Sequence, residues 1–196
     1  MLLLLYNNNI YFNWTCKQTK KKIARCKQTK DAVKDIIDPE KIDFVVADAT
    51  QRLPFEDESV DKVVTTEAMF HFDPRSQFFE EAHRILKPGG TFGFVDLVVL
   101  PSRNCFHRFI LNCMTWSGLL MPESNTYSAE QYYRLLEKSG FSIVEKESIM
   151  KDVVPPYLKY NVCSRWYWYA LQPECLLSFG FMVYPFDYIR VRAIKV

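Results

Sequence analysis

Polar residues stand directly after two apolar runs of the sequence. Asp48 follows the first run, and Glu67 and His71 follow the second. A carboxylate accepts a hydrogen bond from an exocyclic amine, while the backbone amide of Ala49 donates one to a ring nitrogen. Asp48 and Ala49 together therefore match the edge of an adenine ring, and His71 is a candidate general base.

Each of these residues also has a plain structural interpretation. Asp48 would cap a turn, and Glu67 would be a solvent-exposed loop acid. His71 would be a packed polar residue or would close a pocket without taking part in chemistry. The hypothesis of a site therefore depends on whether the surrounding elements bring these residues together.

Three short runs rich in Val and Phe predict strands that are covered on both faces, because they lack clean polar alternation. They are Ile42–Ala47, Val60–Thr66 and Thr91–Val99. In an open sheet of parallel strands, ligands bind outside the carboxyl ends of the strands. Asp48 and Glu67 follow the first two runs, so we expect them to face the same crevice.

A helix is predicted between the second and third of these strands. Asp73 is a favourable N-cap, Pro74 suits the first helical position, and the sequence Pro88-Gly89-Gly90 ends the helix. A strand, a helix and a strand in this order form a right-handed βαβ unit with parallel strands.

The alternation of helices and strands extends along the chain. A helix is expected within residues 20–37, and Ser128 with Gln131 forms a capping box for a later one. Phe141–Ile149 and Phe186–Val196 alternate more clearly and suit an antiparallel pair at one edge of the sheet. The predicted fold class is α/β, a mostly parallel sheet with an antiparallel C-terminal edge.

Composition and charge argue against several classes of protein. With 48% hydrophobic residues, the 196-residue chain suits one domain, and its net charge of +2 gives no electrostatic reason to expect nucleic acid as a partner. The six cysteines contain no C-x-x-C pair, and no metal site is readable. The apolar N-terminal run is too short for a signal peptide or a membrane span. We expect reduced thiols and a cytoplasmic location.

The order of these motifs resembles that of one enzyme family. The segment FVVADATQRLPFEDESVDKVVTTEAMFHF, followed by RILKPGGTFGFVDL, is similar to the central motifs of the class I S-adenosylmethionine-dependent methyltransferases. It resembles in particular the small-molecule group that includes sterol, tocopherol, phosphoethanolamine and macrolide enzymes. The resemblance implies a Rossmann-like sheet with helices on both faces. It also implies a single domain over 1–196, with a cofactor-binding core (10–100), a lid insertion (101–127) and a C-terminal helix with antiparallel strands (128–196).

The resemblance implies roles for single residues. Asp48 and Ala49 would bind the adenine edge of S-adenosylmethionine, and Thr66 and Glu67 would line its methionine half. His71 is the candidate base for an acceptor that carries a proton. The acceptor would be an O, N or C atom of a small apolar or amphipathic molecule, because the lid stretch is rich in Phe, Trp, Leu and Met.

A second group of cofactor contacts is implied by NWTCKQ, Asn13–Gln18, which is similar to the family's ribose-binding segment. Asn13 stands where an acid is common, Trp14 would lie beside the adenine face, and Gln18 would face the cofactor. An uncharged amide is a weaker acceptor for the ribose diol than a carboxylate.

The sequence departs from the family before this segment. The family's first strand and its glycine-rich loop, of the form D-x-G-x-G-x-G, should precede it, but MLLLLYNNN contains no glycine. We therefore interpret the chain as truncated at its N-terminus, without the central strand and without the loop that lets backbone approach the cofactor closely. Weak cofactor binding and slow or absent turnover are expected from this loss.

Two other functions compete with methyl transfer. The first is a catalytically inactive remnant or partial gene model that acts, if at all, as a binding partner of another protein, which the missing loop favours. The second is a nicotinamide-dependent dehydrogenase, which is disfavoured because no G-x-G-x-x-G follows a predicted strand.

The N-terminal run leads to a prediction about topology. Leu2–Tyr6 reads as a strand, and only Asn7-Asn8-Asn9 separates it from Ile10–Asn13. A parallel crossover needs about a dozen residues or more, whereas a hairpin turn is short and tolerates Asn. If the two runs lie side by side in the sheet, we expect them to be antiparallel. A parallel pairing in the structure would contradict this prediction.

Overall fold

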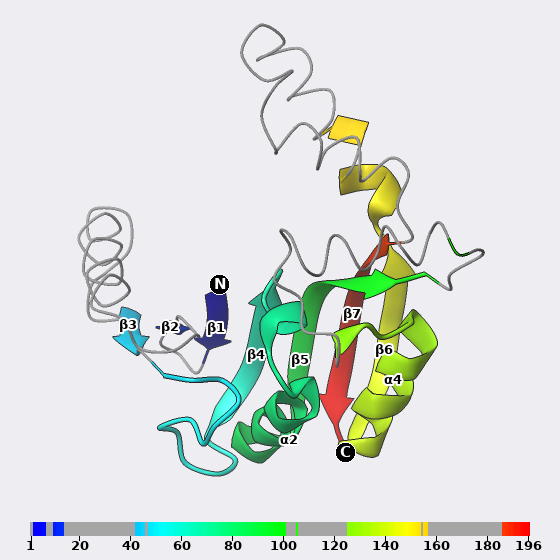
Figure 1. Ribbon diagram of the computed structural model, residues 1–196. Coiled ribbons are helices and arrows are strands. Elements are labelled where there is room, and N and C mark those ends of the chain that lie inside the picture. Colours follow the sequence, from blue (N-terminus) through cyan, green and yellow to red (C-terminus); the bar gives the residue numbers. More distant parts are fainter. Residues whose placement is uncertain are drawn as a thin grey trace, which may run out of the picture.

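The described part of the chain is built around one mixed β-sheet (Figure 1). The computed structural model describes residues 2–6, 10–13, 42–45, 47–100, 105, 125–153, 155–156 and 186–196. The strands are β1 (Leu2–Tyr6), β2 (Ile10–Asn13), β3 (Ile42–Val45), β4 (Val60–Thr66), β5 (Leu86–Val99), β6 (Phe141–Ser148) and β7 (Phe186–Lys195). They form a seven-stranded sheet in the order β3-β2-β1-β4-β5-β7-β6.

The directions of the strands agree with the predicted fold class. Strand β2 is parallel to β3, and β4 is parallel to β5. Strand β7 is antiparallel to both β5 and β6, which confirms the predicted antiparallel edge at the C-terminal end of the chain. Four of the observed strands differ in length from the predicted ones: β3 ends at Val45, β5 already begins at Leu86, and β6 and β7 each end one residue earlier.

Strands β1 and β2 form the antiparallel hairpin that the short Asn segment predicts, with Leu3 opposite Asn13. On its other side β1 is antiparallel to β4, with Leu2 opposite Thr66. The expectation that the sheet lacks a strand at this place is therefore wrong. Strand β1 fills the position between β2 and β4, because a hairpin brings a strand into the sheet in the reverse direction.

The helix between β4 and β5, α2, spans Arg75–Ile85 and begins one residue later than predicted. Its N-cap is Pro74, in an extended conformation, and not Asp73. The helix ends at Ile85, and Leu86 already has an extended conformation. The sequence Pro88-Gly89-Gly90 lies within β5, where Gly89 has a φ of +74° that glycine adopts without strain.

Helix α4 (Ala129–Lys138) begins as predicted. The Ser128 hydroxyl accepts a hydrogen bond from the Gln131 amide at 3.3 Å, and the Gln131 side chain accepts one from the Ser128 amide at 2.9 Å. The turn after the helix contains Gly140 at a φ of +89°. A Cβ atom there would lie 2.6 Å from Nε2 of His83, so both the backbone conformation and the space require glycine.

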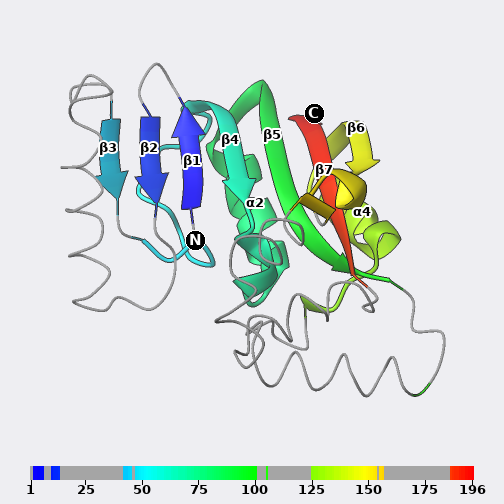
Figure 2. The same ribbon diagram turned by 90° about the horizontal axis from the view of Figure 1, so that it is seen from above.

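Helices α2 and α4 cover the same face of the sheet and pack on its aromatic side chains (Figures 1 and 2). The ring centroid of Phe79 lies 6.1 Å from that of Phe92 and 5.4 Å from that of Tyr132. These contacts join α2, β5 and α4 into one core. The helix predicted within residues 20–37 lies outside the described residues.

A polar group of side chains lies inside this core. Arg75 and Asp96 are fully buried, with 3.6 Å between Nη2 and Oδ2. The Tyr132 hydroxyl donates to the same Asp96 oxygen at 3.0 Å. Burial raises the pKa of Asp96 to about 6, although Arg75 and Tyr132 act in the opposite direction. Such a pair contributes little net stability, but removing one partner leaves a buried charge alone.

The core contacts of Phe79 predict the cost of removing its ring. We expect Phe79→Ala to lower the free energy of unfolding by about 3–5 kcal/mol, because it leaves a cavity between the two helices and β5. Urea unfolding followed by circular dichroism measures this loss. Gln77→Ala, on the exposed side of the same helix, is the control and should have little effect. Equal losses in the two variants would contradict the packing described.

The raised pKa of Asp96 predicts how stability depends on pH. The folded-state pKa of about 6 exceeds the unfolded value of 3.8, so the folded state holds a proton that the unfolded chain releases. Wild type should therefore lose stability relative to Asp96→Asn as the pH rises from about 4 to 6, by up to about 3 kcal/mol. Urea unfolding of both proteins from pH 4 to 7 tests this. A difference that does not vary with pH would contradict it.

Candidate functional site

The predicted site residues belong to strands that end along one edge of the sheet. Asn13 pairs with Val45 on one side and with Leu3 on the other, and Leu2 lies opposite Thr66. The ends of β3 and β4 are separated by three strand spacings, about 14 Å. Figure 2 shows β3, β2, β1 and β4 in this order. An extended ligand could therefore contact all of these strand ends. Trp14 and Gln18, the other predicted contacts from this part, lie outside the described residues.

Asp48 caps the turn that follows β3. Its Oδ1 atom accepts hydrogen bonds from the Thr50 amide at 3.0 Å and from the Thr50 hydroxyl at 2.8 Å. The Asp48 carbonyl accepts a third from the Gln51 amide at 3.1 Å. Both side-chain bonds use one carboxylate oxygen. The turn role and the binding of an amine by Oδ2 are thus compatible, and the latter stays a prediction. Ala49 is fully buried, so its contribution would come from the backbone.

Two charged residues of α2 hold the loop that follows this turn, and the sequence interpretation did not single them out. Glu81 accepts a hydrogen bond from the Leu53 amide at 2.6 Å. Arg84 donates to the carbonyls of Phe55 and Leu53 at 2.9 and 3.2 Å and forms an ion pair with Glu81. The hydrogen bond to Glu81 raises the pKa of Arg84. The signal in the sequence is an acid and a base three residues apart, on one side of the helix.

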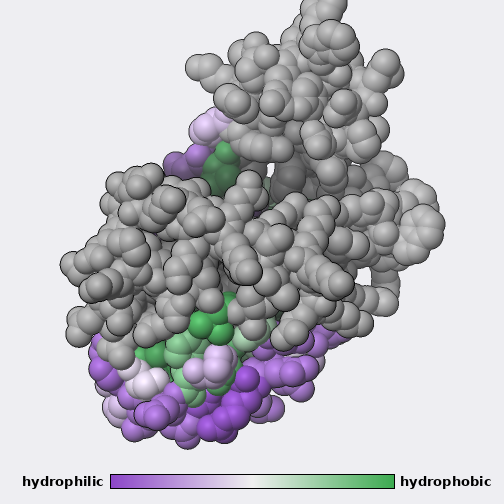
Figure 3. All heavy atoms as spheres, turned by 90° about the vertical axis from the view of Figure 1, so that its left-hand side faces the viewer, coloured by the Kyte–Doolittle hydropathy of each residue, from purple (hydrophilic) through white to green (hydrophobic). Residues whose placement is uncertain are grey.

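The surface of this loop is polar. Its exposed side chains include Gln51, Arg52, Glu56 and Asp57. Figure 3, which views the molecule from the β3 side, shows hydrophilic residues at the end where residues 51–59 lie. The exposed side of the loop is thus polar, whereas Glu81 and Arg84 bind its backbone at Leu53 and Phe55.

Glu67 has an unusual backbone conformation at the end of β4. Its φ is +48°, which is uncommon for a residue other than glycine and occurs preferentially at functional sites. The Glu67 amide donates to the Val95 carbonyl at 2.9 Å, and Oε1 accepts a hydrogen bond from the Tyr188 hydroxyl at 3.0 Å. Glu67 is exposed, as its plain interpretation requires, but β5 and β7 hold it in place. The neighbouring Thr66 is also exposed.

His71 lies in the short 3-10 helix η2 (Met69–His71), which follows Glu67. Its ring is half-buried and lies against Phe70, with 4.0 Å between the ring centroids. The His71 amide donates to the Ala68 carbonyl at 3.1 Å. This geometry agrees with a packed histidine whose side chain is partly exposed, and the role of His71 as a base stays a prediction.

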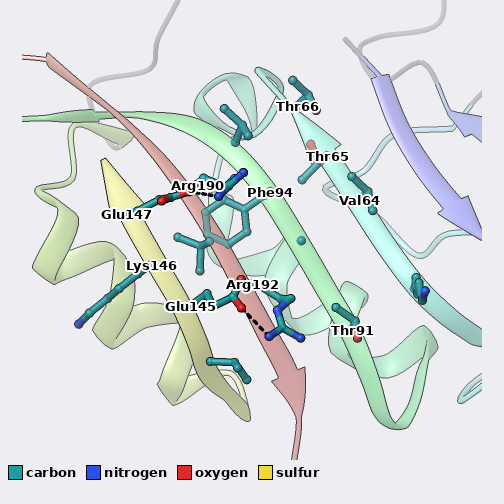
Figure 4. A pocket seen from close by; sticks show the side chains of 15 residues that line it. Val64, Thr65, Thr66, Thr91, Phe94, Glu145, Lys146, Glu147, Arg190 and Arg192 are labelled. Atoms are coloured by element: carbon teal, nitrogen blue, oxygen red, sulfur yellow. Dashed lines mark hydrogen bonds and ion pairs between the residues drawn. The ribbon is translucent and has the colours of Figure 1, made fainter. Parts of the chain in front are cut away.

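A hollow of about 920 Å³ lies on the other face of the sheet, away from α2 and α4 (Figure 4). Its floor includes Val64 and Gly93, and one wall carries the ion pairs of Arg192 with Glu145, at 2.7 Å, and of Arg190 with Glu147. Such exposed pairs contribute little energy. Of the candidate site residues only Thr66 lines this hollow. We therefore do not place the predicted ligand there.

Two further findings concern the described residues as a whole. They contain no group of three or more His, Cys, Asp or Glu side chains that could hold a metal ion. No helix among them combines the length and the apolar character that crossing a membrane requires.

The chain is similar in sequence to known methyltransferases. Residues 7–94 match a family described as a methyltransferase domain. The chain is 32% identical over 133 residues to the erythromycin 3''-O-methyltransferase of Saccharopolyspora erythraea, covering 62% of this chain and 40% of that protein. It is 28% identical over 125 residues to the sarcosine/dimethylglycine N-methyltransferase of Aphanothece halophytica, covering 64% of this chain and 43% of that protein. The chain thus spans about 40% of the length of these relatives.

Solved structures share the fold. A geranyl diphosphate methyltransferase in complex with SAM matches with a TM-score of 0.72 and 16% identity, over 96% of this chain and 69% of that one. A putative sarcosine dimethylglycine methyltransferase from Galdieria sulphuraria matches with a TM-score of 0.72 and 16% identity, over 95% and 69%. The motif order, the sheet and the sequence match are all similar to those of the methyltransferase domain family over residues 7–94 of the chain.

Proposed function

We propose that the protein is an S-adenosylmethionine-dependent methyltransferase that acts on a small molecule. The family match of residues 7–94 carries this proposal. The relatives support the class of acceptor, since they are named as methyltransferases of erythromycin and of sarcosine and dimethylglycine. The arrangement of the site supports the cofactor, because the ends of β3, β2 and β4 lie along one edge.

The residues of this edge would hold the cofactor in an extended form. Asp48 would accept a hydrogen bond from the adenine amine, and the Ala49 amide would donate to a ring nitrogen. Asn13 would hold the ribose. Thr66 and Glu67 would contact the amino-acid half, where the Tyr188 hydroxyl already fixes one Glu67 oxygen. S-adenosylmethionine supplies an electrophilic methyl group on a sulfonium, and the chain contributes orientation and a dry pocket.

Other parts of the proposal concern the acceptor. His71 would remove a proton from an oxygen or nitrogen nucleophile, within hydrogen-bond reach of the acceptor. The lid stretch, residues 101–127, would cover an apolar or amphipathic substrate, and most of it lies outside the described residues. A single domain over 1–196 and a cytoplasmic location also belong to the proposal. The location rests on the cysteine pattern, which has no disulfide framework.

Cofactor binding is the first test of the proposed function. We expect isothermal titration calorimetry of the chain with S-adenosylhomocysteine to give saturable binding at one site. Release of S-adenosylhomocysteine from S-adenosylmethionine would then be followed with a panel of small alcohols, amines and carbon acids as acceptors. Binding without turnover of any acceptor would favour the binding remnant. No binding at millimolar ligand would contradict the proposal. The same titration tests the expectation of weak affinity.

The adenine contact predicts the effect of one substitution. We expect Asp48→Ala to weaken binding of S-adenosylhomocysteine by about 1.5–3 kcal/mol, the usual size of a hydrogen bond to a charged group. This is a rise of the Kd of about 10- to 150-fold in calorimetric titration. Glu56→Ala changes the net charge equally at an exposed site and should leave the Kd unchanged.

Thr50→Val separates the turn role of Asp48 from the adenine contact. This variant removes the hydroxyl that donates to Asp48 at 2.8 Å and keeps the carboxylate. We expect it to retain most of the affinity. If Thr50→Val weakens binding as much as Asp48→Ala does, Asp48 acts only through the turn and the adenine contact is wrong.

A further inference from the structure

The turn that carries His71 is fastened by side chains from two other segments. Arg75 donates from Nε to the Met69 carbonyl at 3.0 Å. Asn125 donates from Nδ2 to the Phe70 carbonyl at 3.3 Å and also to the Phe72 carbonyl. Three carbonyls around His71, those of residues 69, 70 and 72, are therefore held by two side chains.

Both of these side chains are buried. Arg75 is 0% exposed and Asn125 is 1% exposed. The Arg75 guanidinium lies 4.6 Å from the ring centroid of Tyr132 and 5.5 Å from that of Tyr127, beside Asp96.

Stability alone does not explain this arrangement. Among the described residues, neither Nη1 nor Nη2 of Arg75 has a hydrogen-bond partner, and the same holds for Oδ1 of Asn125. A buried charge with unpaired nitrogens is costly, and apolar side chains of similar volume often replace such groups without loss of stability. What Arg75 and Asn125 provide, and apolar side chains would not, is directed hydrogen bonds to the turn.

Asn125 also links this turn to another part of the chain. It stands at the end of the stretch 101–127, and nearby the Val99 amide donates to the Tyr127 carbonyl at 2.9 Å. The chain thus leaves the sheet at Val99 and returns beside that point. The returning segment reaches the turn of His71 through Asn125.

We propose that Asn125 and Arg75 are positioning residues, which hold residues 69–72 in one conformation and so fix the His71 ring at the end of β4. We call the hydrogen bonds of Asn125 and Arg75 to the carbonyls of residues 69, 70 and 72 the lock. Asn125 couples this ring to the segment that returns from the lid stretch. The functional meaning of the lock rests on the proposed methyl transfer. The lock itself is a property of the folded chain and is testable without cofactor or substrate.

The histidine rings report on the lock directly. The chain contains three histidines, so ¹³C labelling of the rings gives one Cε1–H NMR signal for each, assigned by substituting each histidine in turn. The His71 ring lies 4.0 Å from the Phe70 ring, which shifts its signals. The His83 ring lies 5.3 Å from the Phe141 ring and has no contact with the lock, so it is an internal control.

We expect Asn125→Leu and Arg75→Met to move the His71 ring signals toward those of an unstructured histidine and to leave His83 in place. In the same samples, the amide exchange rates of His71 and Phe72 should rise. The factor of this rise should be at least about ten times the factor for the amides of β7. Asn125→Ala, which leaves room for water at the freed carbonyls, replaces Asn125→Leu if the latter does not fold.

Gln131→Ala is the matched control, because it removes the capping box of α4 and lowers stability without touching the turn. It should leave the His71 signals unchanged. The proposal is overturned if the lock variants do not move the His71 signals, or if exchange at His71 and Phe72 rises only as much as it does in β7. A failure of cofactor binding would leave this test unaffected, so the two proposals are distinguishable.

Discussion

The backbone pairing of β1 holds the described structure together. Strands β2 and β3 form one parallel pair, and β4 and β5 form another, and β1 is hydrogen-bonded to both β2 and β4. Without β1, the strand end that leads to Asp48 and the one that leads to Glu67 would belong to separate sheets. The three Asn residues before β2 are too few for a parallel crossover, so the bridging strand has to be antiparallel. The connection between the two halves of the candidate site is thus a consequence of a very short loop.

Helix α2 holds a loop in each half of the candidate site. Near its C-terminus, Glu81 and Arg84 bind backbone groups of the loop that follows Asp48. At its N-terminus, Arg75 binds the turn that carries His71. The apolar side of the same helix packs on the sheet through Phe79, so the position of the helix is set by the core. A rigid element that is fixed by packing thereby holds two loops in a defined relation, as sites that need accurate geometry require.

Local patterns in the sequence predicted the elements well, whereas contacts between distant residues were not predictable from it. The capping box of Ser128 follows from residues three positions apart, and the hairpin follows from a loop of three residues. The contact of Tyr188 with Glu67 joins positions 121 residues apart, and no local pattern indicates it. The burial of Arg75 was also not predictable, because a charged residue in the first turn of a helix is normally exposed. Asp73 was predicted as the N-cap from propensity, but the conformation of Pro74 moved the start of the helix.

We propose that the ends of β3 and β4 form one binding edge. Amide NMR signals of the chain, followed during titration with S-adenosylhomocysteine, test it most directly. We expect the signals of Ala49 and Glu67 to shift together and to give one shared Kd, while those of Thr91 and Arg192 in the hollow of the opposite face stay in place. Shifts confined to the hollow, or to one of the two strand ends, would contradict it.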